Sequence, residues 1–133
     1  MALTVPVKNV RTLIAVATSN AAAATVRGTA DLRSAFGGIL TLKLTTGATG
    51  PTTQALGNVL IAHNAGATPA AGSAGVDWKT LFSFGSGLGA SAITEQSLVI
   101  DPSVMHLEVE VTGNTGQAVV CEAIFSEFTS PTT

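Results

Sequence analysis

Apolar and polar residues alternate along most of this chain, in short runs that glycine, proline, asparagine and serine separate. The clearest run is ILTLKLT (39–45), which places Leu40, Leu42 and Leu44 on one side of a strand and threonine or lysine on the other. A period of two residues predicts a β-strand with one buried face. The same pattern predicts further strands at 10–19, 25–32, 59–63, 77–84 and 93–100, and a final pair within 106–128. About eight such strands predict an all-β fold, a two-sheet antiparallel β-sandwich that is jelly-roll-like.

The segments between these strands are rich in residues that favour turns. SNAAAAT (19–25) is too short to form a stable helix in water, so we expect a loop there. Residues 46–58 are predicted to form a long loop, and NAGATPAAGSAGV (64–76) a mobile excursion. Gly28 is expected at a bulge within its strand.

The length of 133 residues predicts one domain with two short extensions. Pro6 makes the first residues unsuitable for a central strand. We therefore predict an extended N-terminal arm at 1–9, a single β-sandwich domain at 10–130 and a C-terminal tail at 131–133.

The last pair of strands is predicted to form a hairpin. In GNTGQ (113–117), a type I turn with Gly116 in the left-handed conformation suits a bulged hairpin loop. The resulting register places apolar residues opposite one another, in the pairs Val111 with Val119, Val109 with Cys121, Leu107 with Ala123, and Met105 with Phe125. Cys121 is therefore expected in the core and not as a nucleophile.

The opposite face of this hairpin carries His106, Glu108, Glu110 and Glu122, with Glu108 directly across from Glu122. Like charges at that spacing are destabilising, and three explanations remain open. The face is solvated, or it meets lysine or arginine of a neighbouring subunit, or a metal bridges the acids with His106. No second histidine lies nearby in the sequence, so we expect a sheet surface, without metal, cofactor or catalytic residues.

Composition and charge favour a protein that associates with others. Charged residues make up 11 % of the chain, against about 25 % in ordinary soluble domains, and so sparse a charge does little to oppose association. All six basic residues lie within 1–79, whereas six of the eight acids follow residue 80. Either strands of the two halves pair and neutralise each other, or the charges match those of a partner.

The same features argue against several function classes. The sequence has no run of basic residues of the kind that binds nucleic acid. It also has no run of about 20 apolar residues that could span a membrane. The single cysteine and the lack of a recognisable signal peptide fit synthesis in a reducing cytoplasm. GSGLGAS (85–91) lacks the spacing of a dinucleotide-binding loop, so we do not expect an enzyme.

At GGILTLKLTTG (37–47) and VEVTGNTGQAVVCEAIFSEFTS (109–130), the chain resembles small virion proteins of tailed bacteriophages. It is most similar there to the jelly-roll decoration, or cement, proteins on the outside of the capsid. This resemblance implies a non-enzymatic protein that is made in the host cytoplasm, forms dimers or trimers and bridges major capsid protein subunits on the outer surface of the virion. It carries over no individual binding residue.

Two groups of residues are candidates for the interface with such partners. Leu3, Val5 and Val7 alternate as a strand added to a neighbouring sheet would, and Glu108, Glu110 and Glu122 form the acidic group. The alternatives are a phage tail or baseplate component, and a carbohydrate-binding module that uses Trp78 as a platform for sugars.

Overall fold

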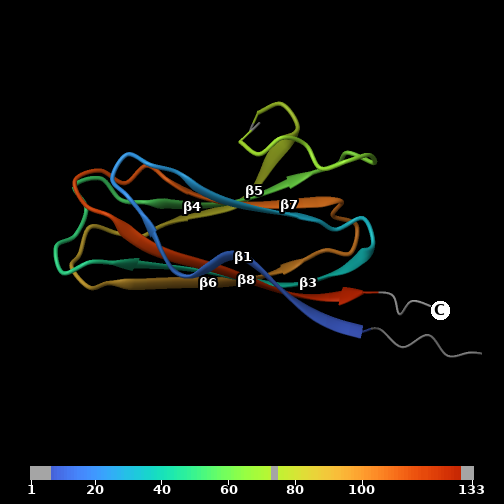
Figure 1. Ribbon diagram of the computed structural model, residues 1–133, viewed down its shortest axis with the longest axis horizontal. Helices are drawn as coiled ribbons and strands as arrows, with labels where there is room; N and C mark the ends of the chain where they lie inside the picture. Colours follow the sequence, from blue (N-terminus) through green and yellow to red (C-terminus); the bar gives the residue numbers. More distant parts are fainter. Residues whose placement is uncertain (1–6, 73–74, 130–133) are drawn as a thin grey trace, which may run out of the picture.

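The computed structural model describes residues 7–72 and 75–129, and this part of the chain forms β-strands and no helix. The strands are β1 (Val7–Asn20), β2 (Val26–Asp31), β3 (Ala35–Thr46), β4 (Leu56–Ala62), β5 (Trp78–Gly85), β6 (Ile93–Ile100), β7 (His106–Thr112) and β8 (Val119–Thr129). They form two four-stranded antiparallel sheets, in the orders β1-β8-β3-β6 and β2-β7-β4-β5, stacked face to face (Figure 1). The predicted all-β sandwich is confirmed.

The strands pair in a nested pattern. β1 pairs with β8, β2 with β7, β3 with β6 and β4 with β5, all antiparallel. The chain thus resembles a long hairpin rolled up so that alternate strand pairs fall in opposite sheets, which is the jelly-roll arrangement. In the described part of the chain, no helix is long and apolar enough to cross a membrane.

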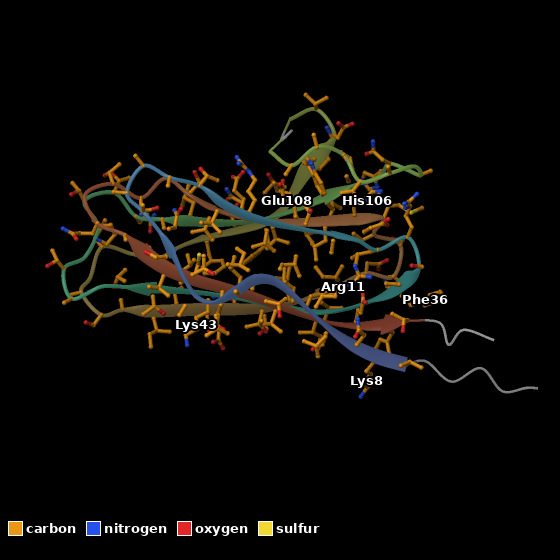
Figure 2. All side chains as sticks on the ribbon, in the orientation of Figure 1. Lys8, Arg11, Phe36, Lys43, His106 and Glu108 are labelled. Carbon is orange, nitrogen blue, oxygen red and sulfur yellow. The ribbon has the colours of Figure 1, made fainter. Side chains whose placement is uncertain are left out.

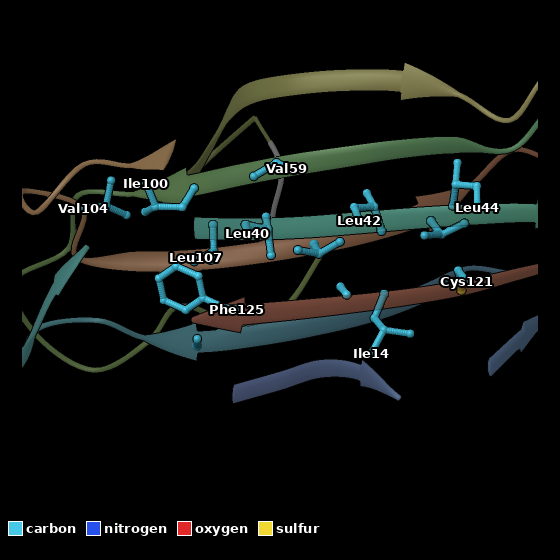
Figure 3. Packing of buried hydrophobic residues seen from close by; sticks show 14 of the residues in the cluster. Ile14, Leu40, Leu42, Leu44, Val59, Ile100, Val104, Leu107, Cys121 and Phe125 are labelled. Atoms are coloured by element: carbon cyan, nitrogen blue, oxygen red, sulfur yellow. The ribbon is translucent and has the colours of Figure 1, made fainter. Parts of the chain in front are cut away.

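The core lies between the two sheets, where the alternating residues of both meet (Figure 3). Leu40, Leu42 and Leu44 are fully buried, as their alternation predicted, and they pack in one cluster with Leu107 and Val109 of the opposite sheet. Full burial of such a side chain stabilises a fold by about 1.5–3 kcal/mol. The ladder of leucines on β3 is therefore a main contributor to holding the sheets together.

The predicted hairpin of the last two strands is wrong. β7 pairs with β2 and β4, whereas β8 pairs with β1 and β3 in the other sheet. The apolar face was predicted correctly except at Met105, which is 37 % exposed. The prediction succeeded elsewhere because residues that face each other across a core show the same alternation as residues paired in one ladder. Cys121 is 1 % exposed, and burial raises the pKa of its thiol to about 11, so its placement in the core is confirmed.

Buried asparagines hold the connection between β7 and β8. Gly116 has a φ of 81°, the left-handed conformation that was predicted. Asn20 donates from Nδ2 to Asn114 Oδ1 at 2.6 Å, and Asn114 donates from its own Nδ2 to the Gln117 carbonyl at 3.0 Å. These bonds attach the crossing segment to the end of β1 and replace the ladder that a hairpin would have provided.

Several predicted boundaries differ from the structure, among them the start of β3 at Ala35 and not at residue 39. β1 begins at Val7, which lies opposite Thr129, so residues 7–9 belong to the sheet and not to an arm. β4 begins at Leu56, within the predicted long loop. The rest of the predicted arm, and the tail at 131–133, lie outside the described residues.

The expected bulge at Gly28 is also wrong, because β2 pairs with β7 in an unbroken register. The carbonyl oxygen of Leu13 in β1 lies so close to Gly28 that a Cβ atom there would overlap it. Glycine therefore allows the edge strand of one sheet to approach the edge strand of the other.

We predict that Gly28→Ala lowers the free energy of unfolding by about 1–3 kcal/mol, the usual cost of forcing extra atoms into a packed site. Gly47→Ala is the matched control, since its nearest neighbour would be 3.7 Å from the new Cβ. Urea unfolding followed by tryptophan fluorescence measures both variants. Equal free energies of unfolding for the two variants would show that β1 can move away from residue 28 without loss of stability.

Candidate functional site

Part of the outer face of the β2-β7-β4-β5 sheet is covered by residues 63–72 and 75–77, called here the strap, which rise over the sheet between β4 and β5 (Figure 1). β4 explains why a cover is needed. Its inward Val59 belongs to the main core, but Leu60 and Ala62 are buried on the outer side, where they pack with Trp78 in a second cluster. A strand that is apolar on both faces needs covering on both, and a small cluster beneath a long loop is a usual solution.

Trp78 is an anchor of the strap and not a surface platform. Its side chain is 1 % exposed, and its Nε1 donates to the carbonyl of Ala70 at 3.1 Å. The suggested sugar platform at Trp78 is therefore wrong, because the strap covers the ring and a sugar could not stack on it.

His106 holds the first half of the strap. Its Nε2 lies 2.9 Å from the carbonyl oxygen of Asn64 and 3.1 Å from that of Gly66. Carbonyl oxygens only accept hydrogen bonds, so Nε2 carries the proton. The Thr68 hydroxyl is 3.0 Å from Nδ1, and Asp31 Oδ1 is 3.7 Å from the same atom. The ring is fully buried, which corrects the expectation that His106 lies on an exposed sheet surface.

Glu108 lies beneath the second half of the strap and is fully buried as well (Figure 2). Its Oε1 accepts a hydrogen bond of 3.0 Å from the backbone amide of Gly72, while its Oε2 has no hydrogen-bond partner among the described residues. Arg27 Nε is 3.9 Å from Oε1. Removal from water raises the pKa of Glu108, and the nearby charge of Glu110 adds to this, whereas the Gly72 amide and Arg27 oppose it.

The other two predicted acids have partners of their own. Glu110 accepts from Arg27 Nε at 3.0 Å and from Asn58 Nδ2 at 3.1 Å. Glu122 lies in the other sheet, 3.5 Å from Lys43 Nζ.

The expected pairing of Glu108 with Glu122 is therefore wrong, and Glu108, Glu110 and Glu122 do not form one acidic surface. The suggested metal site fails for the same reason, and the described ranges contain no group of three residues placed to hold a metal. Instead, Arg11 with Glu127 at 2.7 Å, Arg27 with Glu110 and Lys43 with Glu122 join the two halves of the chain. Pairing within one domain explains the segregation of charge.

The outer face of the β1-β8-β3-β6 sheet is different, because large apolar side chains stand exposed on it. We call this surface the open face. Its residues near the chain ends include Val10, Ile39, Val99 and Phe128, with exposed fractions of 64, 52, 75 and 40 %. A depression of about 310 Å³ lies beside Ile39 and Phe128, and its lining also includes Lys8, Gly38, Ser126 and Glu127.

Of the predicted interface residues, Val7 is the first residue of β1 and is 49 % exposed. Leu3 and Val5 lie outside the described residues. The sequence did not reveal that His106 and Glu108 would be covered. One feature of the sequence could have indicated this cover. β4 is apolar on both faces, and a long segment able to cover its outer face follows it directly.

Comparison with known proteins shows the fold alone. No family model and no curated protein matches the sequence. Among solved structures, the K3 cleaved adhesin domain of Lys-gingipain from Porphyromonas gingivalis W83 is similar with a TM-score of 0.56 and 10 % identity, over 85 % of this chain and 72 % of that one. The prophage-derived protein YomS of SPBc2 gives a TM-score of 0.43 at 16 % identity, over 95 % and 98 % of the two chains. A chain of the infectious bursal disease virus Gx strain gives 0.48 at 12 %, over 93 % and 32 %.

We predict that Glu108→Gln gains stability relative to the native protein as the pH rises. An acid whose pKa is raised by folding contributes stability below its unfolded pKa and loses that contribution as the pH rises through the folded value. The free energy of unfolding of the variant should therefore increase relative to that of the native protein as the pH rises above about 4.5, the ordinary pKa of a glutamate side chain. Urea unfolding at several pH values measures this difference. Glu122→Gln, which removes a carboxylate that is 23 % exposed, is the control, and a pH-independent difference for Glu108→Gln would contradict the argument.

Proposed function

We propose that this protein is a non-catalytic structural subunit of a bacteriophage virion, which binds the outside of the capsid and bridges major capsid protein subunits. The observation that carries this proposal is the make-up of its surface. Fifteen large apolar side chains are exposed among the described residues, whereas the whole chain has only 14 charged residues. Two of those, Glu108 and Glu127, are buried.

Such a surface suits a subunit that is buried against other subunits in an assembly. Exposed apolar patches mark interaction sites on soluble proteins, and a low surface charge does little to keep molecules apart. The buried polar groups support a structural role too, because His106 and Glu108 are occupied in binding the strap. The jelly roll supplies a stiff body for the contacts.

The proposed attachment uses main-chain pairing at the start of β1. This strand lies at the edge of its sheet, with exposed Val7 and Val10, and residues 1–6 precede it. In this proposal Leu3 and Val5 extend into a neighbouring capsid subunit as an added strand, where backbone hydrogen bonds supply affinity and alternate side chains supply specificity.

A tail or baseplate component with the same fold is the second candidate, since the same exposed surface suits any large assembly. The burial of Trp78 argues against a carbohydrate-binding module that uses this ring.

The test uses particles made by the cell that encodes this protein. Antibodies against the protein, observed by electron microscopy, should label the outer shell. Labelling of the tail instead would support the second candidate, and unlabelled particles would contradict both.

We further expect that deletion of residues 1–6 weakens binding to shells that lack the protein by about tenfold or more, since a few lost backbone hydrogen bonds exceed 1.4 kcal/mol. Deletion of residues 130–133 is the matched control, and co-sedimentation with shells measures both. The shortened protein keeps all of β1, so thermal unfolding should be unchanged. Equal binding by the two deletions would exclude the arm as the anchor.

A further inference from the structure

The open face is complementary to itself in side-chain size and charge when two copies are placed face to face about a two-fold axis. β8 and β3 are the two central strands of this sheet. Their outward residues lie side by side in the pairs Ser126 with Ile39, Ile124 with Thr41, and Glu122 with Lys43. Each pair combines a large side chain with a small one, or a negative charge with a positive one.

We propose that two copies of this chain associate through the open face, about a two-fold axis that runs parallel to the strands between β8 and β3. This rotation places β3 of one copy over β8 of the other and keeps each residue at its own level along the strands. Ile39 of each copy then faces Ser126 of the other, beside the depression lined by Gly38 and Phe128. The large side chain of one copy thus meets the small one of the other at both places.

The charges match under the same rotation. Lys43 and Glu122 are 3.5 Å apart within one copy. In the pair of copies, each Lys43 faces the Glu122 of the other, so that two cations and two anions alternate around the axis, and the Glu95 of each copy flanks its own Lys43. Each charge then has opposite charges as its neighbours, which favours this register over others.

The outer strands of the sheet agree with this arrangement. Val10 of β1 and Val99 of β6 lie at the level of Ile39 and Ser126, so Val10 of one copy faces Val99 of the other. At the next level, Thr12 faces Ser97 in the same way. Apolar residues thus meet apolar residues, and hydroxyl groups meet hydroxyl groups.

The area of the open face approaches that of an ordinary dimer interface. Four strands spaced by about 4.8 Å, with about eight residues each at about 3.3 Å, give a flat projection of about 500 Å². Side chains that project from the sheet enlarge the accessible area toward the roughly 800 Å² that each partner contributes to an ordinary interface. Two sheets that pack face to face with nearly aligned strands are also a usual arrangement in proteins.

Sedimentation velocity at micromolar concentrations tests the proposal, with an expected mass of twice the 13.3 kDa of one chain. Ile39→Glu places an unpaired carboxylate in the contact, and we expect it to weaken dimerisation about tenfold or more. Val76→Glu is the matched control, because Val76 is equally apolar, is exposed, and lies on the strap at the other sheet. A monomeric native protein, or a dimer that Ile39→Glu and Val76→Glu affect equally, would overturn the proposal.

A charge exchange tests the register. Glu122→Lys should produce monomers, because four positive charges then meet at the axis. The triple variant Lys43→Glu/Glu95→Lys/Glu122→Lys restores alternation, with Glu95 exchanged too because it pairs with Lys43 in the sheet, and it should restore the dimer. Thermal unfolding verifies that each variant is folded. A triple variant that stays monomeric although folded would contradict the proposed axis.

Cross-linking tests the geometry directly. A short bismaleimide should join chains carrying Ile39→Cys to chains carrying Ser126→Cys, and should not join Val76→Cys to Ser126→Cys. The native Cys121 is buried and common to all variants. Equal yields in the two mixtures would contradict the face-to-face contact. None of these measurements depends on the capsid, so a failed dimer leaves the proposed function untouched and the reverse also holds.

Discussion

The nested pairing of strands from the two ends of the chain is the constraint on which the rest of this structure depends. β1 lies beside β8, and β2 beside β7, so early strands always have late neighbours. Because the bases occur early and most acids late, this pairing brings Arg11 to Glu127 and Arg27 to Glu110. Both carboxylates are largely removed from water, with side-chain exposures of 0 % for Glu127 and 12 % for Glu110, and the cost of that removal offsets much of the attraction between the paired charges. The main effect of these ion pairs is therefore to distinguish this set of strand neighbours from others, while the apolar core supplies the stability.

Alternation predicted which residues face inward but not which strands are neighbours. The register proposed for the last two strands placed Val109 and Cys121 on one apolar face, and both are indeed buried. Yet they lie in opposite sheets. A period of two residues records only the side to which a residue points, and two strands that face each other across a core satisfy it as well as two paired strands. The choice depends on the connection, where the buried side chain of Asn114 binds the end of β1. No pattern among neighbouring residues of the sequence predicts this contact between Asn114 and the end of β1, because the two are far apart in the chain.

The candidate site was harder to predict for a related reason. His106 and Glu108 were correctly assigned to the outer side of their strand, but the outer side is covered by the strap. The strap binds them through the carbonyls of Asn64 and Gly66 and the amide of Gly72. Every residue has these backbone groups, so their use is invisible in a sequence. Only Leu60 and Ala62, which make β4 apolar on its outer side too, indicated that the chain had to return over this sheet.

The same reasoning explains why association is expected at one face and one short edge. The strap occupies one outer face, which leaves the open face of the other sheet. The edge strand β1 is interrupted between Thr12 and Thr18, where the register against β8 shifts twice and Ala17 adopts a φ of 62°. Such irregularities prevent an edge from pairing along its whole length with another chain. The first part of β1, before the interruption, is regular, and the proposed added strand continues from it into a neighbouring subunit. The two proposed contacts are thus separate, with the open face for a second copy and the start of the edge strand for a capsid subunit.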